Sequence, residues 1–145
     1  MALFVFNAGL GRVAALAALP AANDGLVIVP LQASGLPADA TLKDCATLAA
    51  VLAAGATEQT TMGRKPLGSV TVTVNNALDR VEVDAADVTW TATGGTAVGA
   101  FVIGYDPDTT AGTDADIIPL VKSDATVTPD GNDFMLTITD FYRAS

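Results

Sequence analysis

Four aspartates stand close together in the stretch YDPDTTAGTDADI, at Asp106, Asp108, Asp114 and Asp116. Carboxylate oxygens at short spacing in a flexible stretch are ligands that Ca²⁺ prefers, so a calcium site is one interpretation. The order is not that of an EF-hand loop, because the glycine stands at the seventh position and the terminal glutamate is missing. Aspartate also favours turns, since its side chain bonds its own backbone. We therefore expect a solvated acidic loop without a high-affinity metal site, and keep calcium as the alternative.

Composition excludes most nucleophilic and redox catalysis. The sequence has no histidine, which removes Ser-His-Asp and Cys-His arrangements and histidine-bearing zinc sites. Cys45 is the one cysteine, so neither a disulfide within the chain nor a thiolate cluster can form. Its alanine and leucine neighbours predict a buried thiol.

A pair of carboxylates could still hydrolyse a glycosidic bond. Sugar-binding clefts are usually lined by aromatic side chains, whereas this sequence has one tryptophan, two tyrosines and five phenylalanines. Trp90 shares the parity of Val88 in a strand-like run and is expected in the core. The sequence therefore predicts a protein that is not an enzyme and uses no cofactor.

The net charge of −9 comes from the second half of the chain. Residues 1–66 balance four carboxylates with four basic groups, whereas residues 67–145 hold twelve carboxylates and three basic groups. An acidic surface without a basic stripe repels phosphate backbones. We therefore expect no direct binding to nucleic acid.

The apolar N-terminus differs from a signal peptide, because no positive charge precedes it and polar residues and glycines interrupt it. The longest apolar run, residues 13–19, is too short to span a bilayer. These features predict an unprocessed, soluble chain without a membrane partner. A length of 145 residues suits a single domain, 1–145, with an N-terminal arm (1–6), a helix-containing segment (7–57) and a β-rich core (58–145).

Two helices are expected before residue 58. Asn7 can cap a helix over residues 7–19. A second helix over residues 41–54 has Thr41 and Asp44 as a capping pair. Alanines occupy its polar face where a free surface helix would carry charge, so we expect it to pack against a sheet or another subunit.

The remaining chain has the pattern of short strands. SVTVTV alternates so that Val70, Val72 and Val74 are expected on the inner face. RVEVD returns after a turn, and the inward parity then slips around residues 85–87, which predicts a bend or bulge. Further strands are expected at residues 26–31, 100–105, 117–121, 125–128 and 134–139. This spacing predicts a mainly β, single-domain, β-sandwich or jelly-roll-like fold with one or two short N-terminal helices.

Three stretches, GRKPLGSVTVTVNNALDRVEVDAADVTWTATGGT, YDPDTTAGTDADIIPL and the terminal DFYRAS, resemble small structural virion proteins of tailed bacteriophages. Members of this group are described as head decoration or cement proteins. The most distinctive piece is Asp-Val-Thr-Trp at residues 87–90, followed by the Tyr-Asp-Pro-Asp loop. The resemblance implies a homo-oligomeric decoration protein, made in the bacterial host cytoplasm and located on the head exterior. Its implied partners are the major capsid protein and copies of itself.

The arm and the alanine-faced helix are expected to make these contacts. Left loose in water, the apolar arm would promote aggregation, but it could pair with a neighbour's sheet edge. The expected contact residues are Leu3, Phe4, Phe6, Leu48 and Leu52. The alternative is that arm and helix complete the protein's own core. The alternative function is a tail- or fibre-associated module that binds a host-surface glycan, which requires a groove with exposed aromatic groups.

Overall fold

The computed structural model describes residues 3–145. The elements from the N-terminus to the helical segment are β1 (Leu3–Val5), the 3₁₀ helix η1 (Asn7–Gly9), α1 (Val13–Ala17), β2 (Gly25–Gln32), α2 (Asp39–Lys43) and α3 (Leu48–Ala53). The strands that follow are β3 (Lys65–Pro66), β4 (Thr71–Asn75), β5 (Arg80–Asp84), β6 (Val88–Trp90), β7 (Val98–Asp106), β8 (Ile118–Val127), β9 (Phe134–Leu136) and β10 (Tyr142–Ala144). Strands account for 36% and helices for 13% of the structure, and the sheets are antiparallel. The prediction of a mainly β fold is confirmed.

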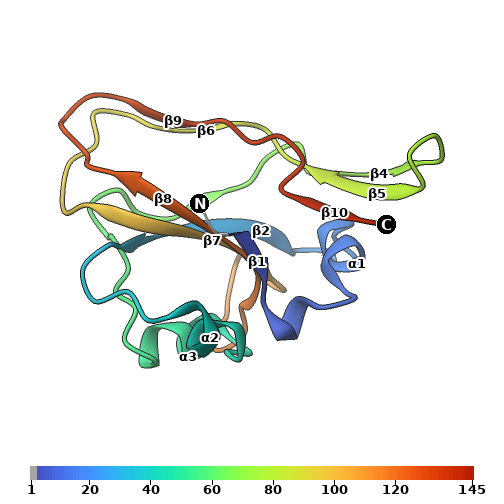
Figure 1. Ribbon diagram of the computed structural model, residues 1–145, viewed down its shortest axis with the longest axis horizontal. Helices are drawn as coiled ribbons and strands as arrows, with labels where there is room; N and C mark the ends of the chain where they lie inside the picture. Colours follow the sequence, from blue (N-terminus) through green and yellow to red (C-terminus); the bar gives the residue numbers. More distant parts are fainter. Residues whose placement is uncertain (1–2) are drawn as a thin grey trace.

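A central sheet forms the middle layer of the molecule (Figure 1). Within residues 3–145 it has five strands in the order β1-β8-β7-β2-β3. Most residues of its long strands β2 and β7 are buried whichever way their side chains point. Near-continuous apolar runs such as LVIVPL are typical of strands that are covered on both faces. The sheet therefore separates two hydrophobic cores.

The segment that contains α2 and α3 covers one face of the central sheet (Figure 1). The buried residues of the core on this side are Phe4, Phe6, Val29, Leu31, Leu42, Cys45, Leu48, Val51, Ala56, Val102 and Ile117. Phe4 and Phe6 meet edge to face, with ring centroids 5.0 Å apart. Burial of this apolar surface is the main force that holds the helices on the sheet.

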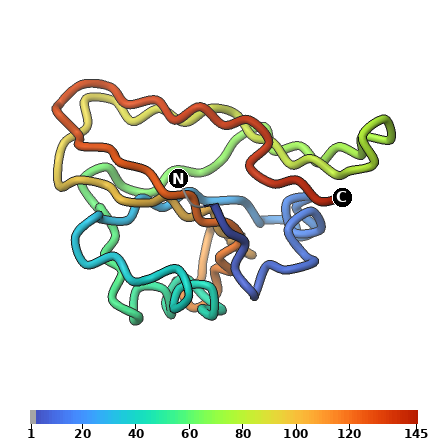
Figure 2. The backbone as a smooth tube through the Cα atoms, viewed as in Figure 1, coloured from blue at the N-terminus to red at the C-terminus, as the bar shows by residue number. Residues whose placement is uncertain are grey.

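Two small antiparallel sheets, β6-β9 and β10-β5-β4, cover the opposite face together with α1. Figure 2 shows the C-terminal segment running beside the residues around β6 above the central sheet. An aromatic cluster fills the space between these layers. Trp90 lies with its ring centroid 5.5 Å from that of Phe101 and 5.9 Å from that of Phe134. This half of the molecule is a β-sandwich.

The helix expected over residues 41–54 is two short helices, α2 and α3. Thr47 has an extended backbone, and its side-chain oxygen accepts a hydrogen bond from the N–H of Ala50 at 3.1 Å. The cap is therefore Thr47, which restarts a helix at Leu48. The N–H of Leu48 also donates to the carbonyl of Ile117 at 2.9 Å, so a tertiary contact fixes the interruption.

The helix expected over residues 7–19 is interrupted in the same way. η1 and α1 are separated by Gly11, whose φ of +72° favours glycine. Asn7 caps neither of them through its side chain; its amide donates to the Asp44 carboxylate at 2.7 Å. The described residues thus contain three short α-helices, together with the 3₁₀ helix η1, where one or two helices were expected.

The predicted bend around residues 85–87 is present. β5 ends at Asp84 and β6 begins at Val88, and between them the chain passes from one small sheet to the other. The prediction for Val74 is wrong, because this side chain is 67% exposed. The β4–β5 hairpin projects past the core, so its outer half has no layer to pack against (Figure 1). The strands expected at residues 117–121 and 125–128 are one strand, β8.

Candidate functional site

The N-terminal arm is part of the protein's own central sheet. β1 pairs with β8 in the register Leu3↔Ser123, Phe4↔Lys122 and Val5↔Val121. Phe4 is 8% exposed and Phe6 is fully buried, so the prediction that both contact a neighbouring subunit is wrong. The rings of Phe4 and Phe6 are buried in the protein's own core, between the helices and the central sheet. Leu3 points to the other face and is 61% exposed, so among the three expected arm contacts Leu3, Phe4 and Phe6 it is the one available to a partner.

Of the two partner contacts expected at α3, Leu48 and Leu52, the prediction for Leu48 is wrong. Leu48 is fully buried in the same core as Phe4, because its side chain points from α3 towards the central sheet. Leu52 is half-buried and packs against that core. The loop after β7 meets α3 at its first turn, where Ala49 donates its N–H to the carbonyl of Asp114 at 3.0 Å, whereas Ala53 at the end of the helix is exposed.

The four aspartates of the loop after β7 each have partners within the protein. Asp106 accepts a hydrogen bond from the N–H of Asp108, and Asp108 accepts two from Thr110. The Asp116 carboxylate accepts the N–H of Thr113 at 2.8 Å. Asp114 forms an ion pair with an arginine on another segment. Among residues 3–145, no group of three or more carboxylate, thiol or imidazole side chains is arranged to hold a metal ion.

Arg64 links this loop to the segment before β3. Its guanidinium lies 2.7 Å from the Glu58 carboxylate and 2.6 Å from the Asp114 carboxylate. The hydrogen bond from Arg64 lowers the pKa of Asp114, and the hydrogen bonds to Glu58 and Asp114 raise the pKa of Arg64. No local sequence pattern predicts this ion pair, because Arg64 and Asp114 are 50 residues apart in the chain.

We expect calcium to have no effect on the stability of the chain. The carboxylates of Asp108 and Asp116 are occupied by hydrogen bonds that stabilise the turns of their own loop. Thermal unfolding followed by circular dichroism, with calcium and with a chelator, should give the same Tm within about 1 °C, and Asp108→Asn should not change this comparison. A fall of several degrees on chelation that Asp108→Asn removes would identify the loop as a calcium site.

A lysine on β8 is buried beside β1. No local sequence pattern predicts its burial. The side chain of Lys122 on β8 is 1% exposed. Its ammonium lies 2.6 Å from the Asp39 carboxylate, forms a second ion pair with Asp124, and stands 5.3 Å from the centroid of the Phe4 ring. Burial lowers the pKa of Lys122, but the hydrogen bonds that its ammonium donates to Asp124 and Asp39 outweigh this effect, so the pKa is raised. This cluster ties the start of α2 to the central sheet.

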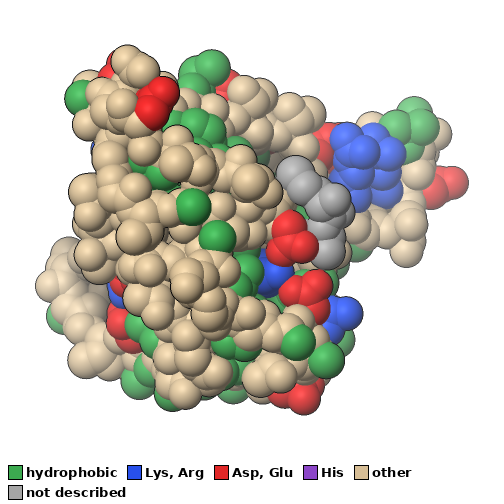
Figure 3. Space-filling view, turned by 60° about the vertical axis from the view of Figure 1, so that its left-hand side comes forward, with side chains coloured by type: hydrophobic (Ala, Val, Ile, Leu, Met, Phe, Trp, Pro, Cys, Tyr) green, Lys and Arg blue, Asp and Glu red, His purple; other side chains and the backbone are tan. Residues whose placement is uncertain are grey.

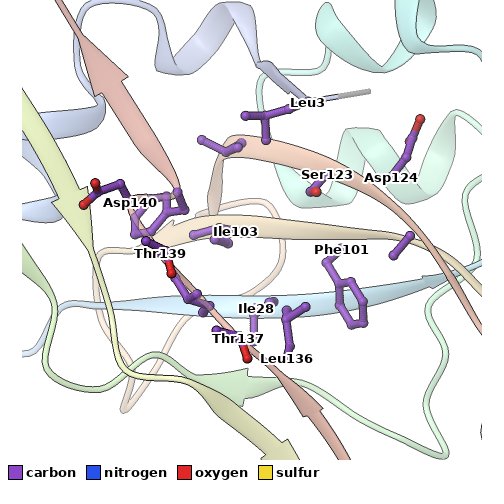
Figure 4. Close-up of a pocket in the computed structure, with 14 residues that line it drawn as sticks. Leu3, Ile28, Phe101, Ile103, Ser123, Asp124, Leu136, Thr137, Thr139 and Asp140 are labelled. Carbon is purple, nitrogen blue, oxygen red and sulfur yellow. The ribbon is translucent and has the colours of Figure 1, made fainter. Parts of the chain in front are cut away.

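A cavity of about 230 Å³ lies between the central sheet and the segment of residues 136–141. Figure 4 shows Ile28, Phe101 and Ile103 on the side of the central sheet and Leu136 on the side of the C-terminal segment. The exposed side chain of Leu3 borders the cavity. A partner that inserts an apolar side chain here would cover Leu3 as well.

Two carboxylates, Asp124 and Asp140, line the same cavity. A carboxylate glycosidase would need such a pair. Each of these groups has a basic partner, because Asp124 pairs with Lys122 and Asp140 pairs with Arg143 at 2.8 Å. The ion pairs give both carboxylates a role in holding their segments in place.

The residues of the Asp-Val-Thr-Trp motif and of the Tyr-Asp-Pro-Asp loop contribute to the scaffold. Trp90 donates its indole N–H to the carbonyl of Gly63 at 2.9 Å, and the Asp87 carboxylate accepts the N–H of Ile138 at 2.8 Å. The Tyr105 hydroxyl donates to Asp24 at 2.7 Å; burial, and then this hydrogen bond, raise the pKa of Tyr105 to about 12. The motif therefore determines how the layers are joined.

No family model, curated protein or solved structure matches the chain. Between residues 3 and 145, none of the helices has the length and apolar character required to cross a membrane.

Proposed function

We propose that this chain is a non-enzymatic structural protein of a tailed-bacteriophage virion. It binds the exterior of the head in many copies and reinforces the contacts between shell subunits. Its partners are the major capsid protein and further copies of the chain. The starting point is the resemblance of residues 64–120 to head decoration proteins, and the scaffold role of Asp87 and Trp90 in that stretch supports it.

The observation that carries the proposal is the exposed Leu3 beside an apolar cavity. Leu3 begins β1, which is the edge strand of the central sheet. A segment of the capsid protein can therefore pair with the edge of β1 and place an apolar side chain against Leu3. Figure 3 shows a face of the molecule that is largely uncharged, with most of its charged side chains gathered towards the right-hand side of the view. Such a surface suits contact with another protein.

The glycan-binding alternative has less support. Sugar-binding grooves present aromatic rings to the ligand. Trp90 is 1% exposed and Phe101 is 3% exposed, and both rings pack inside the sandwich. A glycan array with the purified chain tests this alternative directly.

Leu3→Glu is expected to weaken binding to heads by about 10- to 100-fold, which corresponds to losing the burial of one leucine side chain. The measurement is co-sedimentation of purified protein with heads that were prepared without it. Leu10→Glu is the matched control, because Leu10 is 60% exposed and Leu3 is 61% exposed. The contact at Leu3 is wrong if both variants bind like the intact chain, and the proposed function is wrong if the intact chain does not bind.

A further inference from the structure

The hairpin of β4 and β5 projects from the body of the molecule (Figures 1 and 2). β4 is the outer strand of the sheet β10-β5-β4, and it pairs only with β5. In the part of the chain that the structure describes, no other strand bonds to the outer side of β4. Alternate residues of an edge strand turn their N–H and C=O groups outward, so β4 offers a row of backbone hydrogen-bond donors and acceptors to another strand.

β4 lacks the features that protect β3, an edge strand of the central sheet. The edge strand β3 consists of Lys65 and Pro66, a charged residue and a residue without an N–H. β4 spans Thr71–Asn75 and contains neither a charge nor a proline. Its valine face is open at the tip, where Val74 is 67% exposed, and Leu78 in the following turn is 55% exposed. A five-residue edge of this kind is a site for strand addition.

The sequence of β4 is complementary to itself. Thr-Val-Thr-Val-Asn reads almost the same in both directions. When two copies run antiparallel with Thr73 opposite Thr73, Val72 of each copy faces Val74 of the other, and Thr71 faces Asn75. Directly opposite side chains lie on the same face of a sheet. The valines of both copies would therefore form one apolar stripe, and the threonines would share the other face.

Charge does not oppose a second copy at this edge. The chain carries a net charge of −9, so two copies repel each other wherever their acidic groups meet. β4 itself is uncharged, and the nearest carboxylates on this sheet, Glu82 and Asp84, belong to β5. In the paired arrangement the two β5 strands are separated by three strand spacings, about 14 Å. That exceeds the Debye length of about 8 Å at physiological ionic strength, so their repulsion is largely screened.

We propose that β4 is the contact between two copies of this chain, which pair antiparallel through Thr71–Asn75 and join two three-stranded sheets into one of six strands. This deepens the proposed function by naming the contact between copies; it rests on the homo-oligomeric part of that proposal and not on shell binding. A single pair of short strands is a small interface. Association in solution is therefore weak, with a Kd on the order of 10–100 µM, and becomes effective where copies are held close together on a shell.

Sedimentation of the isolated chain from about 1 µM to about 500 µM tests the proposal, because this range spans the expected Kd. The mass should rise from 14.6 kDa towards twice that value. Thr73→Lys places two like charges across the twofold axis and should weaken association at least about tenfold, since like charges directly opposite are destabilising. Thr126→Lys is the control, because Thr126 is an exposed threonine on β8, in the central sheet. Circular dichroism checks that both variants fold.

A cross-linking measurement makes the register testable. Thr73→Cys should form a covalent dimer under mild oxidation, whereas Thr126→Cys should not, and the native Cys45 is buried. The proposal is overturned if the intact chain stays monomeric throughout the range, or if Thr73→Lys associates like the intact chain. If the chain is monomeric and Thr73→Lys instead abolishes binding to heads, a capsid segment occupies the edge and self-pairing is wrong. Failure of the intact chain to bind heads, with self-association intact, would contradict the proposed function alone.

Discussion

Replacing Trp90 with alanine is expected to lower the free energy of unfolding by about 3–5 kcal/mol, as for other buried aromatic residues. Trp90 is 1% exposed and packs against the rings of both Phe101 and Phe134, which also stack on each other. It also donates to the carbonyl of Gly63, so its removal leaves both a cavity and an acceptor without its partner. Since domains are stable by about 5–15 kcal/mol, this one change approaches the whole stability of the fold.

Urea unfolding followed by circular dichroism is the appropriate measurement, because the sequence has only one tryptophan and fluorescence would lose its probe. Met135→Ala on the neighbouring strand β9 is the control. Met135 pairs with Thr89 but is 59% exposed, so its truncation should cost less than about 0.5 kcal/mol. A Trp90→Ala effect below about 1 kcal/mol would mean that the layers are not joined through this ring.

Neutralising both carboxylates around Lys122 is the second change with a large expected effect. Asp39→Asn together with Asp124→Asn leaves a buried ammonium without a carboxylate and should destabilise the fold by about 3–5 kcal/mol. Adding Lys122→Met to this double variant removes the charge and keeps a side chain of similar length beside Phe4. The triple variant should therefore recover most of the lost stability, since hydrophobic replacement of a whole buried ion cluster is often neutral.

The comparison of these variants decides whether the charge of Lys122 matters. The ion pairs do not hold α2 on the sheet if the free energy of unfolding of the double variant lies within about 1 kcal/mol of that of the intact chain. The same conclusion follows if adding Lys122→Met to the double variant fails to restore its stability. Lys122→Met alone should have a smaller effect than the double variant. The side chains of Asp39 and Asp124 are 40% and 35% exposed and can be hydrated.

Alkaline titration gives the same cluster a second readout. The pKa of Lys122 is raised in the folded state above its usual value of 10.5. Its ion pairs therefore contribute their full stability below pH 10.5 and lose it as the pH rises through the raised pKa. The intact chain should lose more stability than Lys122→Met over that range.

The long strands β2 and β7 were predictable from the sequence, because a strand that is covered on both faces requires an apolar run. The bend between β5 and β6 was also predictable, since buried Val83 and buried Trp90 have opposite parity. The exposure of Val74 at the end of the β4–β5 hairpin was not predictable. An alternating strand pattern shows which side chains share a face, but not whether another layer covers that face at Val74.

The candidate site was less predictable than the fold. The arm has the same sequence signals whether it pairs with its own sheet or with that of a neighbour, because both offer identical backbone groups. A lysine in a strand is normally exposed, and Lys122 finds Asp39 only through a contact between residues 83 positions apart. Such contacts depend on the tertiary arrangement, which no local pattern contains.

Cryo-electron microscopy of the particle that carries this chain tests the central claim most directly. We expect density for the β-sandwich at many equivalent positions on the outside of the head, with Leu3 at the contact with the capsid protein. The result that would contradict the account is density for this chain only at the tail or fibres, or its absence from purified particles.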